Sequence, residues 1–297
     1  MKPPAVIRRK IKDLLLKTLP DYGYELVYVR GRNPLLVGNI VEDRWITCNF
    51  CGTVFKRTES NHSESLACQV CDAIARERVV YQCILLELSR RTGQTYLFIR
   101  EATPLRNLTM LECSPRPNAV RRAMYEGILE KYSASDFDMS VHSTSLKIDL
   151  TNDEDVTHFE NNFDIIICSH VLEHIPDYNV ALSSLNKMLA PDGLLILQVP
   201  LLESRYTKVT WDEFHQDNTR TYHRFGFDLL FELDQHFRFV KPVVGLLDFE
   251  ITSPEIKPDK YELLKGIRER CIILGEDYLT YLGLGNPDLC DAFVARK

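Results

Sequence analysis

The sequence lacks several features that would place it in a specialised class of protein. No apolar run approaches the ~20 residues that a membrane-spanning helix needs. There is no internal repeat and no low-complexity segment, so neither a repeat array nor a disordered tract is expected. The formal net charge of −6 argues against a polyanionic partner, although the amino-terminal stretch is basic. What remains is the composition of an ordinary globular chain, with 45% apolar and 26% charged residues.

The amino-terminal stretch, MKPPAVIRRKIKDLLLKTLP, also lacks the features of a targeting segment. Lys12, Asp13 and Lys17 interrupt its apolar residues, so it is typical neither of a secretory signal nor of a serine-rich transit peptide. We expect an amphipathic helix here. The nine cysteines are an odd number, and together with the missing export signal they indicate a reducing, cytoplasmic location in which thiols bind metal or are buried.

Four of the cysteines form two Cys-x-x-Cys pairs, and these are the strongest local motif in the chain. The pairs are Cys48/Cys51 and Cys68/Cys71, and Gly52 stands where a tight turn after the second thiol favours glycine. Such turns present two sulfurs to one ion, and the spacing is that of a zinc ribbon. Four thiolates leave no open coordination position, so we predict a structural Zn²⁺ site. The alternatives are two disulfides or buried free cysteines; His62, between the pairs, is interpreted as a loop residue.

The rest of the chain alternates between helical and strand patterns. Helices are predicted over 72–94 (ended by Gly93), 117–132, 177–193 and 225–236, and strands over 108–113, 145–150, 163–169, 194–200, 237–247 and 290–297. Strand 163–169, FDIIICS, is continuously apolar, as buried parallel strands are. This alternation predicts an α/β fold with a doubly wound, mostly parallel sheet. The polar stretch 203–224 is predicted to be irregular and follows a strand's carboxyl end, where such sheets bind ligands.

The segment 163–200 resembles the fourth-to-fifth-strand region of class I S-adenosylmethionine-dependent methyltransferases. The resemblance is carried by Phe163-Asp164, by 171–175 (VLEHI) and by 189–193 (LAPDG). The stretch CQVCDAIARERVVYQ and the later HQDNTRTY are similar to elements of a bacterial zinc-knuckle subgroup. The resemblance covers roughly residues 48–240. It implies a Rossmann-like seven-stranded methyltransferase domain over 76–297, after a zinc knuckle at 41–75 and a helix-and-strand extension at 1–40.

One departure from the family lies in 111–117, LECSPRP, where the family's glycine-rich loop is expected. The acidic residue Glu112 is present and the glycines are absent. Glycine allows a close approach of backbone to ligand, and Pro115 and Pro117 each remove an N–H donor. A proline-containing replacement also occurs in the zinc-knuckle subgroup, so we interpret the departure as a trait of that subgroup.

The resemblance implies a set of residues that bind S-adenosylmethionine. Glu112 would accept from the methionine ammonium, Asp136 from the ribose hydroxyls and Asp149 from the adenine amino group. Leu150 would present a backbone N–H to the ring, while Ser114 and Ser169 would line the cofactor cleft. Alternatively, Glu112 is a surface acid and Arg116, a candidate for the methionine carboxylate, is a solvent-exposed arginine.

Methyl transfer requires the acceptor, methyl carbon and sulfur to be collinear, and a hydroxyl acceptor also needs a base. We rank His170 and His215 first as catalytic candidates, ahead of Asp217 and His223. His174 is interpreted as structural. The remaining cysteines in apolar runs are interpreted as buried hydrophobic residues, namely Cys83, Cys113, Cys168 and Cys271.

The sequence therefore favours a methyltransferase that acts on an O or N atom of a small-molecule or glycan acceptor, away from any membrane. One alternative is a methyltransferase of structured RNA, for which a basic face around Arg76, Arg78 and residues 8–10 would be needed. Another is a scaffold that has kept the fold but not the cofactor. The sequence does not indicate an oligomeric state.

Overall fold

The computed structural model describes most of the region from the cysteine pairs to the last strand. The described residues are 24–27, 35–38, 45–56, 67–94, 96–142, 144–200, 206–214, 219–226, 228–245, 272–274 and 292–297. The predicted amino-terminal helix lies outside them, as do His62, His215, Asp217 and Cys271. No helix in the described part of the chain is both long and apolar enough to cross a membrane.

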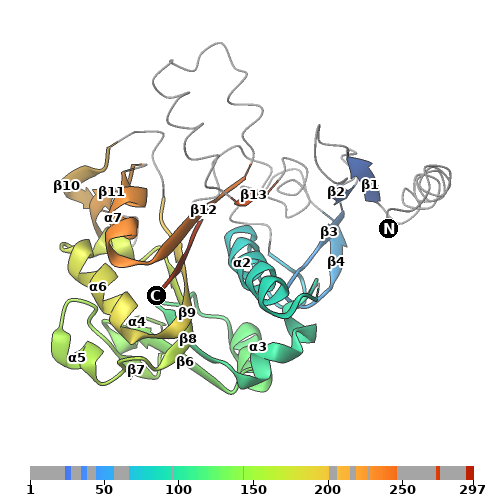
Figure 1. The fold of residues 1–297 in the computed structure, drawn as a ribbon, viewed down its shortest axis with the longest axis horizontal. Helices are drawn as coiled ribbons and strands as arrows, with labels where there is room; N and C mark the ends of the chain where they lie inside the picture. The colour runs from blue at the N-terminus through green and yellow to red at the C-terminus, as the bar shows by residue number, and fades with distance from the viewer. Residues whose placement is uncertain are drawn as a thin grey trace, which may run out of the picture.

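The centre of the protein is one eight-stranded sheet with the order β13-β12-β14-β9-β8-β5-β6-β7 (Figure 1). Its strands are β5 (Thr109–Cys113), β6 (Lys131–Asp136), β7 (Leu146–Lys147), β8 (Phe163–Ser169), β9 (Leu189–Gln198), β12 (Phe239–Gly245), β13 (Ile272–Leu274) and β14 (Ala292–Arg296). Only β14 runs antiparallel to its neighbours, β9 and β12. The prediction of a doubly wound, mostly parallel sheet is confirmed, and β13 adds a short strand at one edge.

Alternate residues of the central strands enter two different cores, because successive side chains of a strand point to opposite faces. In β8, Ile165 and Ile167 belong to one buried cluster, and Ile166 and Cys168 belong to the other. Both faces are therefore covered, which explains why this strand is apolar without interruption.

Helices occupy both faces of the sheet. The helices are α2 (Ala75–Thr92), α3 (Ala119–Ile128), α4 (Met139–His142), α5 (Asp153–Thr157), α6 (Tyr178–Met188) and α7 (Leu229–His236), with 3-10 turns η3 (Ile99–Glu101), η4 (Thr103–Asn107) and η5 (Leu172–His174). Side chains from α2 and α3 fill the first core, and side chains from α6 and α7 fill the second. The layers are thus helix, sheet and helix.

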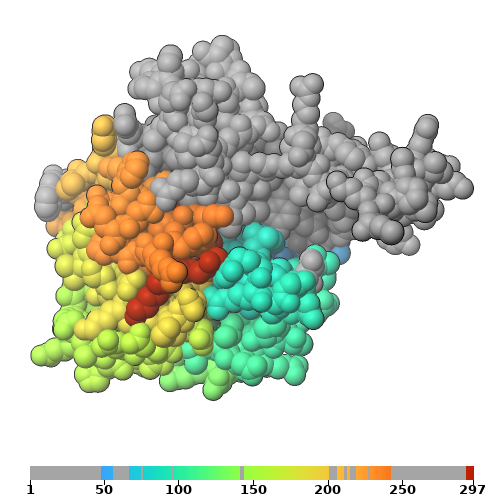
Figure 2. Space-filling model, in the orientation of Figure 1, coloured from blue at the N-terminus to red at the C-terminus, as the bar shows by residue number. Residues whose placement is uncertain are grey.

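Helix α2 begins and ends as the sequence predicts and is tied to the sheet by charge. At its start, the backbone N–H of Ile74 donates to Glu77 Oε2 at 3.0 Å, and at its end Gly93 adopts a left-handed φ of 72°. Glu87, which is 6% exposed, accepts from Arg90, Arg91 and, on β14, Arg296. Figure 2 shows the surface of α2 adjoining that of the carboxyl-terminal strand.

Three antiparallel hairpins lie outside the central sheet. They are β1–β2 (Tyr24–Val27 with Leu35–Gly38), β3–β4 (Trp45–Thr47 with Val54–Lys56) and β10–β11 (Lys208–Phe214 with Arg220–Arg224). The last hairpin corrects the prediction that 203–224 is irregular. Apolar and polar residues alternate over only a short stretch of this hairpin, because a bulge shifts the register of strand pairing between Val209 and Glu213.

Three other elements differ from prediction in their bounds. Pro117 precedes α3 rather than lying in its first turn, because the Asn118 side chain accepts from the Arg121 N–H and caps the helix there. Helix α6 ends at Met188, and residues 189–193 already belong to β9. The predicted strand 145–150 is reduced to the two residues of β7.

Candidate functional site

A small pocket lies at the carboxyl ends of β5 and β8. Its wall comes from these two strands, from the loop after β5, from α3 and from the first turns of α2. The lining residues are Arg76, Glu77, Val80, Tyr81, Glu112, Cys113, Ser114, Pro115, Arg116, Arg121, Ile167 and Ser169. Parallel sheets bind ligands at this edge.

Glu112 is the buried acid of the pocket, so the alternative of a surface acid is wrong. Its side chain is held by two contacts, with Tyr132 donating to Oε2 at 2.7 Å and Arg121 Nη2 lying 3.4 Å from Oε1. Burial raises the pKa of Glu112, and the nearby guanidinium of Arg121 opposes that rise. Glu112 is 7% exposed and lines the pocket, so its carboxylate is placed to meet a cationic ligand.

Ser114 stands at the turn after β5 and has a left-handed φ of 46°. That conformation is the one glycine adopts most easily, so the backbone follows a glycine-like course without glycine. The Ser114 hydroxyl donates to Oδ2 of Asp136 at the end of β6, and the Asp138 N–H donates to Oδ1 at 2.8 Å. Asp136 is buried at the end of β6 and is not among the residues that line the pocket, so its predicted contact with the ribose stays a prediction.

Asp149 and Leu150 follow β7 and are not among the residues that line this pocket. The Asp149 carboxylate accepts from the backbone and hydroxyl of Thr151, at 2.8 and 2.7 Å, which makes a local turn. Leu150 is buried in the second core. Their predicted contacts with adenine stay predictions.

A polar cluster follows β8. Ser169 Oγ donates to Gln198 at 2.8 Å, and His170 has a left-handed φ of 55°. His170 Nδ1 lies 3.4 Å from Oε1 of Glu173. Glu173 is 2% exposed, and its oxygens have no hydrogen-bond partner among the described residues. A buried carboxylate beside an imidazole is an arrangement that can orient a base, although only Ser169 of this cluster is among the residues that line the pocket.

Two other histidines have structural contacts. His174 Nδ1 lies 2.8 Å from the backbone oxygen of Arg220, and His223 Nε2 lies 2.9 Å from that of Pro176. His223 is also buried and packs edge-on against Tyr178. Both therefore connect the loop after β8 to the β10–β11 hairpin, and His223 is a weaker catalytic candidate than His170.

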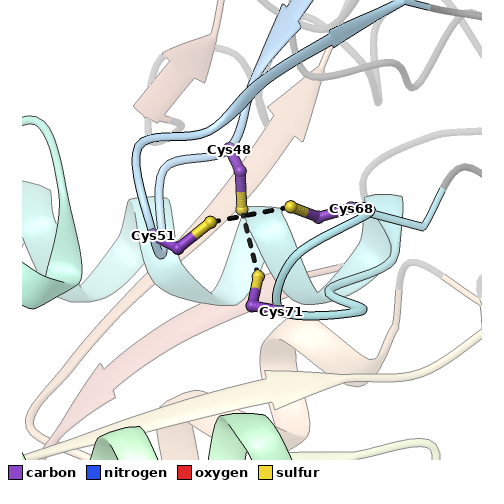
Figure 3. A group of neighbouring side chains, drawn as sticks. All are labelled: Cys48, Cys51, Cys68 and Cys71. Atoms are coloured by element: carbon purple, nitrogen blue, oxygen red, sulfur yellow. Dashed lines mark hydrogen bonds between the residues drawn. The ribbon is translucent and has the colours of Figure 1, made fainter.

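The four cysteines of the paired motif converge on one point, as Figure 3 shows. Their sulfurs lie within 4.8 Å of one another, with Cys48–Cys71 and Cys51–Cys68 both at 3.6 Å. Tetrahedral zinc with Zn–S bonds of ~2.3 Å places its sulfurs about 3.8 Å apart, so the arrangement fits the metal. All four thiols are free, which excludes the disulfide alternative for them.

A buried cation lies beside the cysteine cluster. Within the cluster, hydrogen bonds between the thiols lower the pKa of Cys68 and raise those of Cys48 and Cys71. Arg78 is fully buried beside the cluster, donating to the Ala73 oxygen at 2.6 Å and stacking on Phe55. Burial lowers the pKa of Arg78, and the neighbouring Cys48 and Cys68 oppose that shift. A buried cation here would balance part of the negative charge of four thiolates around a bound metal ion.

The model of a family described as a methyltransferase domain matches residues 68–240, more than half of the chain. The chain belongs to this methyltransferase family. The expectation from the fourth-strand motif is thereby confirmed at the level of the family.

Solved structures resemble the methyltransferase at low identity. A SAM-dependent methyltransferase from Archaeoglobus fulgidus is 15% identical over 73% of this chain and 94% of its own, with a TM-score of 0.37. One from Mesorhizobium loti is 14% identical over 65% and 92%, with a TM-score of 0.38. The trans-methyltransferase CalH, whose structure was solved with SAH, is 20% identical to this chain, with a TM-score of 0.26. The match covers 34% of this chain and only 33% of CalH. No curated protein matches the chain.

Sequence reasoning missed several pocket residues of the methyltransferase, chiefly those supplied by α2. Glu77 and Tyr81 lie on the first turns of that helix, and Arg121 comes from α3. The charged run Arg76-Glu77-Arg78, directly before the apolar residues of the helix, was the available signal. Arg78 is buried, so it cannot belong to the basic face that the RNA alternative needs, and residues 8–10 lie outside the described part of the chain.

Proposed function

We propose that the protein is an S-adenosylmethionine-dependent methyltransferase that modifies an O or N atom of a small-molecule or sugar-like acceptor. The observation that carries this proposal is the pocket at the ends of β5 and β8, with the buried acid Glu112 in its wall. S-adenosylmethionine, when bound, supplies an electrophilic methyl group on a sulfonium. The chain's own residues bind and orient it and hold the acceptor in line.

The pocket residues fit the charges of this cofactor. Glu112 offers a carboxylate to the ammonium, and Arg116 offers a guanidinium to the carboxylate. The Tyr81 hydroxyl is buried, lines the pocket and has no hydrogen-bond partner among the described residues. An unsatisfied buried hydroxyl is costly, so a polar ligand at this place would stabilise the protein. Burial raises the pKa of Tyr81 well above its usual value, so the hydroxyl stays a neutral donor.

For the nucleotide part of the cofactor, Asp136 would accept from the ribose hydroxyls, exchanging its contact with Ser114 for the ligand. Asp149 and the Leu150 N–H remain the candidates for adenine. Ser169 lines the pocket beside β8, next to the position we assign to the methyl group.

Removal of the acceptor proton is assigned to His170, positioned by Glu173. The 3.4 Å contact from His170 Nδ1 to Glu173 Oε1 would leave Nε2 to take the proton as the acceptor attacks the methyl carbon. We expect His170→Ala to lower kcat while the affinity for S-adenosylmethionine is kept. A fall in cofactor affinity with unchanged kcat would contradict this role.

The zinc site would be structural, with Cys48, Cys51, Cys68 and Cys71 filling all four coordination positions. No position is left for a reacting water or substrate. The site therefore stabilises the knuckle and takes no part in bond making.

Calorimetry with S-adenosylmethionine and S-adenosylhomocysteine tests the cofactor assignment directly. Heat of binding and a thermal shift with both ligands are expected; their absence would favour the silent scaffold. Transfer of labelled methyl to phenolic, amine and sugar acceptors would then be compared with transfer to ribosomal RNA. Labelling of RNA alone, weakened steeply by added salt, would favour the nucleic-acid alternative.

A further inference from the structure

The zinc knuckle and the wall of the pocket are parts of one continuous segment. The turn that carries Cys68 and Cys71 leads directly into α2, and the first turns of α2 supply Arg76, Glu77, Val80 and Tyr81 to the pocket. The position of the metal-binding turn therefore fixes the position of this wall.

The knuckle also holds the glycine-free loop after β5. Arg116 donates to Oδ2 of Asp72 at 2.7 Å and to the Asp72 backbone oxygen. Asn118 Nδ2 donates to the backbone oxygen of the metal ligand Cys71 at 2.8 Å. Asp72 has a left-handed φ of 56°, which turns its carbonyl and carboxylate toward the same guanidinium. The middle and the carboxyl end of the loop are thus attached to the residues at and after the last cysteine.

A second connection runs through buried charges to Glu112. Glu77 accepts from the Ile74 N–H at the start of α2 and also pairs with Arg121. Arg121, which is 3% exposed, lies with Nη2 at 3.4 Å from Glu112 and donates to the backbone oxygen of Arg116 at 3.0 Å. One guanidinium therefore joins the helix that follows the knuckle, the loop after β5 and the acid of the pocket.

We propose that the metal-binding knuckle holds the cofactor pocket in its binding shape, with Asp72, Glu77 and Arg121 as positioning residues; this rests on the proposed function. In glycine-rich loops the backbone itself is shaped to approach the ligand. Here the loop contains Pro115 and Pro117, and its shape is imposed from outside by contacts with the knuckle. Cofactor affinity is consequently coupled to metal binding.

The coupling has a direct physical cause. Metal binding supplies much of the folding free energy of a small thiolate site, so a metal-free knuckle loses its fixed turns. Asp72 and Glu77 then no longer stand opposite Arg116 and Arg121. A buried guanidinium that loses a partner is strongly destabilising, so the loop and Glu112 rearrange around Arg121.

The test uses the full chain with Asp72→Asn, which breaks the charge pair with Arg116 and replaces neither a metal-ligand candidate nor a residue assigned to the cofactor. Asp153→Asn is the matched control, because Asp153 forms an equally short 2.7 Å ion pair with Lys187 on another part of the protein. Zinc content, thermal unfolding and affinity for S-adenosylmethionine are measured for both variants, for the wild type and for chelator-treated wild type.

We expect Asp72→Asn to keep its full complement of zinc and to bind the cofactor roughly three- to tenfold more weakly, the effect of one partly exposed charge pair. The zinc-free protein should bind more than tenfold more weakly, and Asp153→Asn should match the wild type. Unchanged affinity in Asp72→Asn would overturn the inference, even if the zinc-free protein unfolds. If the zinc-loaded wild type does not bind the cofactor, the proposed function is wrong and the inference falls with it.

Discussion

Replacing Glu112 by Gln separates the two roles that the structure allows this residue. As the ammonium acceptor, Glu112 would matter for affinity; as the counter-ion of Arg121, it would matter for stability. Gln keeps the size of the side chain and can still accept from Tyr132, but it removes the negative charge.

The structure sets the expected size of both effects. A hydrogen bond to a charged group contributes ~1.5–3 kcal/mol, so loss of the ammonium contact should weaken S-adenosylmethionine binding about 10- to 150-fold. Stability should change little, because Arg121 keeps its pairing with Glu77. Burial also raises the pKa of Glu112, which means that its charged form is costly in the folded state. The free energy gained by removing that buried charge offsets part of the free energy lost with the Arg121 contact.

Isothermal titration with S-adenosylmethionine, S-adenosylhomocysteine and adenosine, together with urea unfolding, measures both quantities. The two amino-acid-containing ligands should lose affinity equally, and adenosine should lose none. Glu126→Gln is the control, because Glu126 forms an exposed ion pair with Arg122 on α3. If Glu112→Gln binds all three ligands like the wild type but unfolds several kcal/mol more easily, Glu112 is a structural counter-ion and the ammonium assignment is wrong.

Three further predictions concern stability. The double variant Cys48→Ser/Cys51→Ser should lose zinc and melt at a lower temperature, since the metal supplies folding free energy to the knuckle; an unchanged melting temperature without zinc would contradict this. The free energy of unfolding of Ser114→Gly should exceed that of Ser114→Ala by about 1 kcal/mol. Both variants lose the contact with Asp136, but only glycine adopts the left-handed φ without strain. Equal free energies of unfolding in denaturant would refute the strain. Burial raises the pKa of Glu87, but hydrogen bonds from its arginines outweigh this effect and hold the pKa at about 2, below the ordinary 4.5. The contribution of ionised Glu87 to the free energy of unfolding is therefore present above pH 4.5 and is lost as the pH falls toward 2. Glu87→Gln should therefore lower the free energy of unfolding at neutral pH by ~1–3 kcal/mol and flatten its fall down to about pH 3, measured by urea unfolding; a parallel pH profile would count against the pair.

The sequence predicted the parts of the fold that depend on local pattern. Buried strand 163–169 was assigned to the residue, because its apolar run reflects burial on both faces. Helix 72–94 was correct to within a few residues, with Gly93 at its end. The β10–β11 hairpin was missed because a bulge interrupts its pairing and with it the alternation of apolar and polar residues.

At the candidate site, residue type and spacing were sufficient to predict the metal-ligand candidates, because one sequence motif contains all four of them. The four cysteines were found because Cys-x-x-Cys is a local geometry. Glu77 and Arg121 were not found, because their importance depends on α2 and α3 meeting at the end of β5. Arg78 entered only as part of the basic face that the RNA alternative would need, and its burial beside the thiol cluster could not be predicted from the charged run around it.

The loop after β5 lacks the glycines of an ordinary cofactor site, and the structure gives a physical reason why it can do without them. A left-handed residue is still required after β5, and Ser114 takes it at an energetic cost that glycine would avoid. A strained conformation persists only where surrounding contacts determine it. Here those contacts are the hydroxyl bond to Asp136 and the attachment of Arg116 to Asp72, so the loop is rigid because its neighbours hold it. The zinc knuckle and the glycine-free loop are therefore expected to occur together, and a chain with this loop but without the cysteine pairs should not bind the cofactor in the same way.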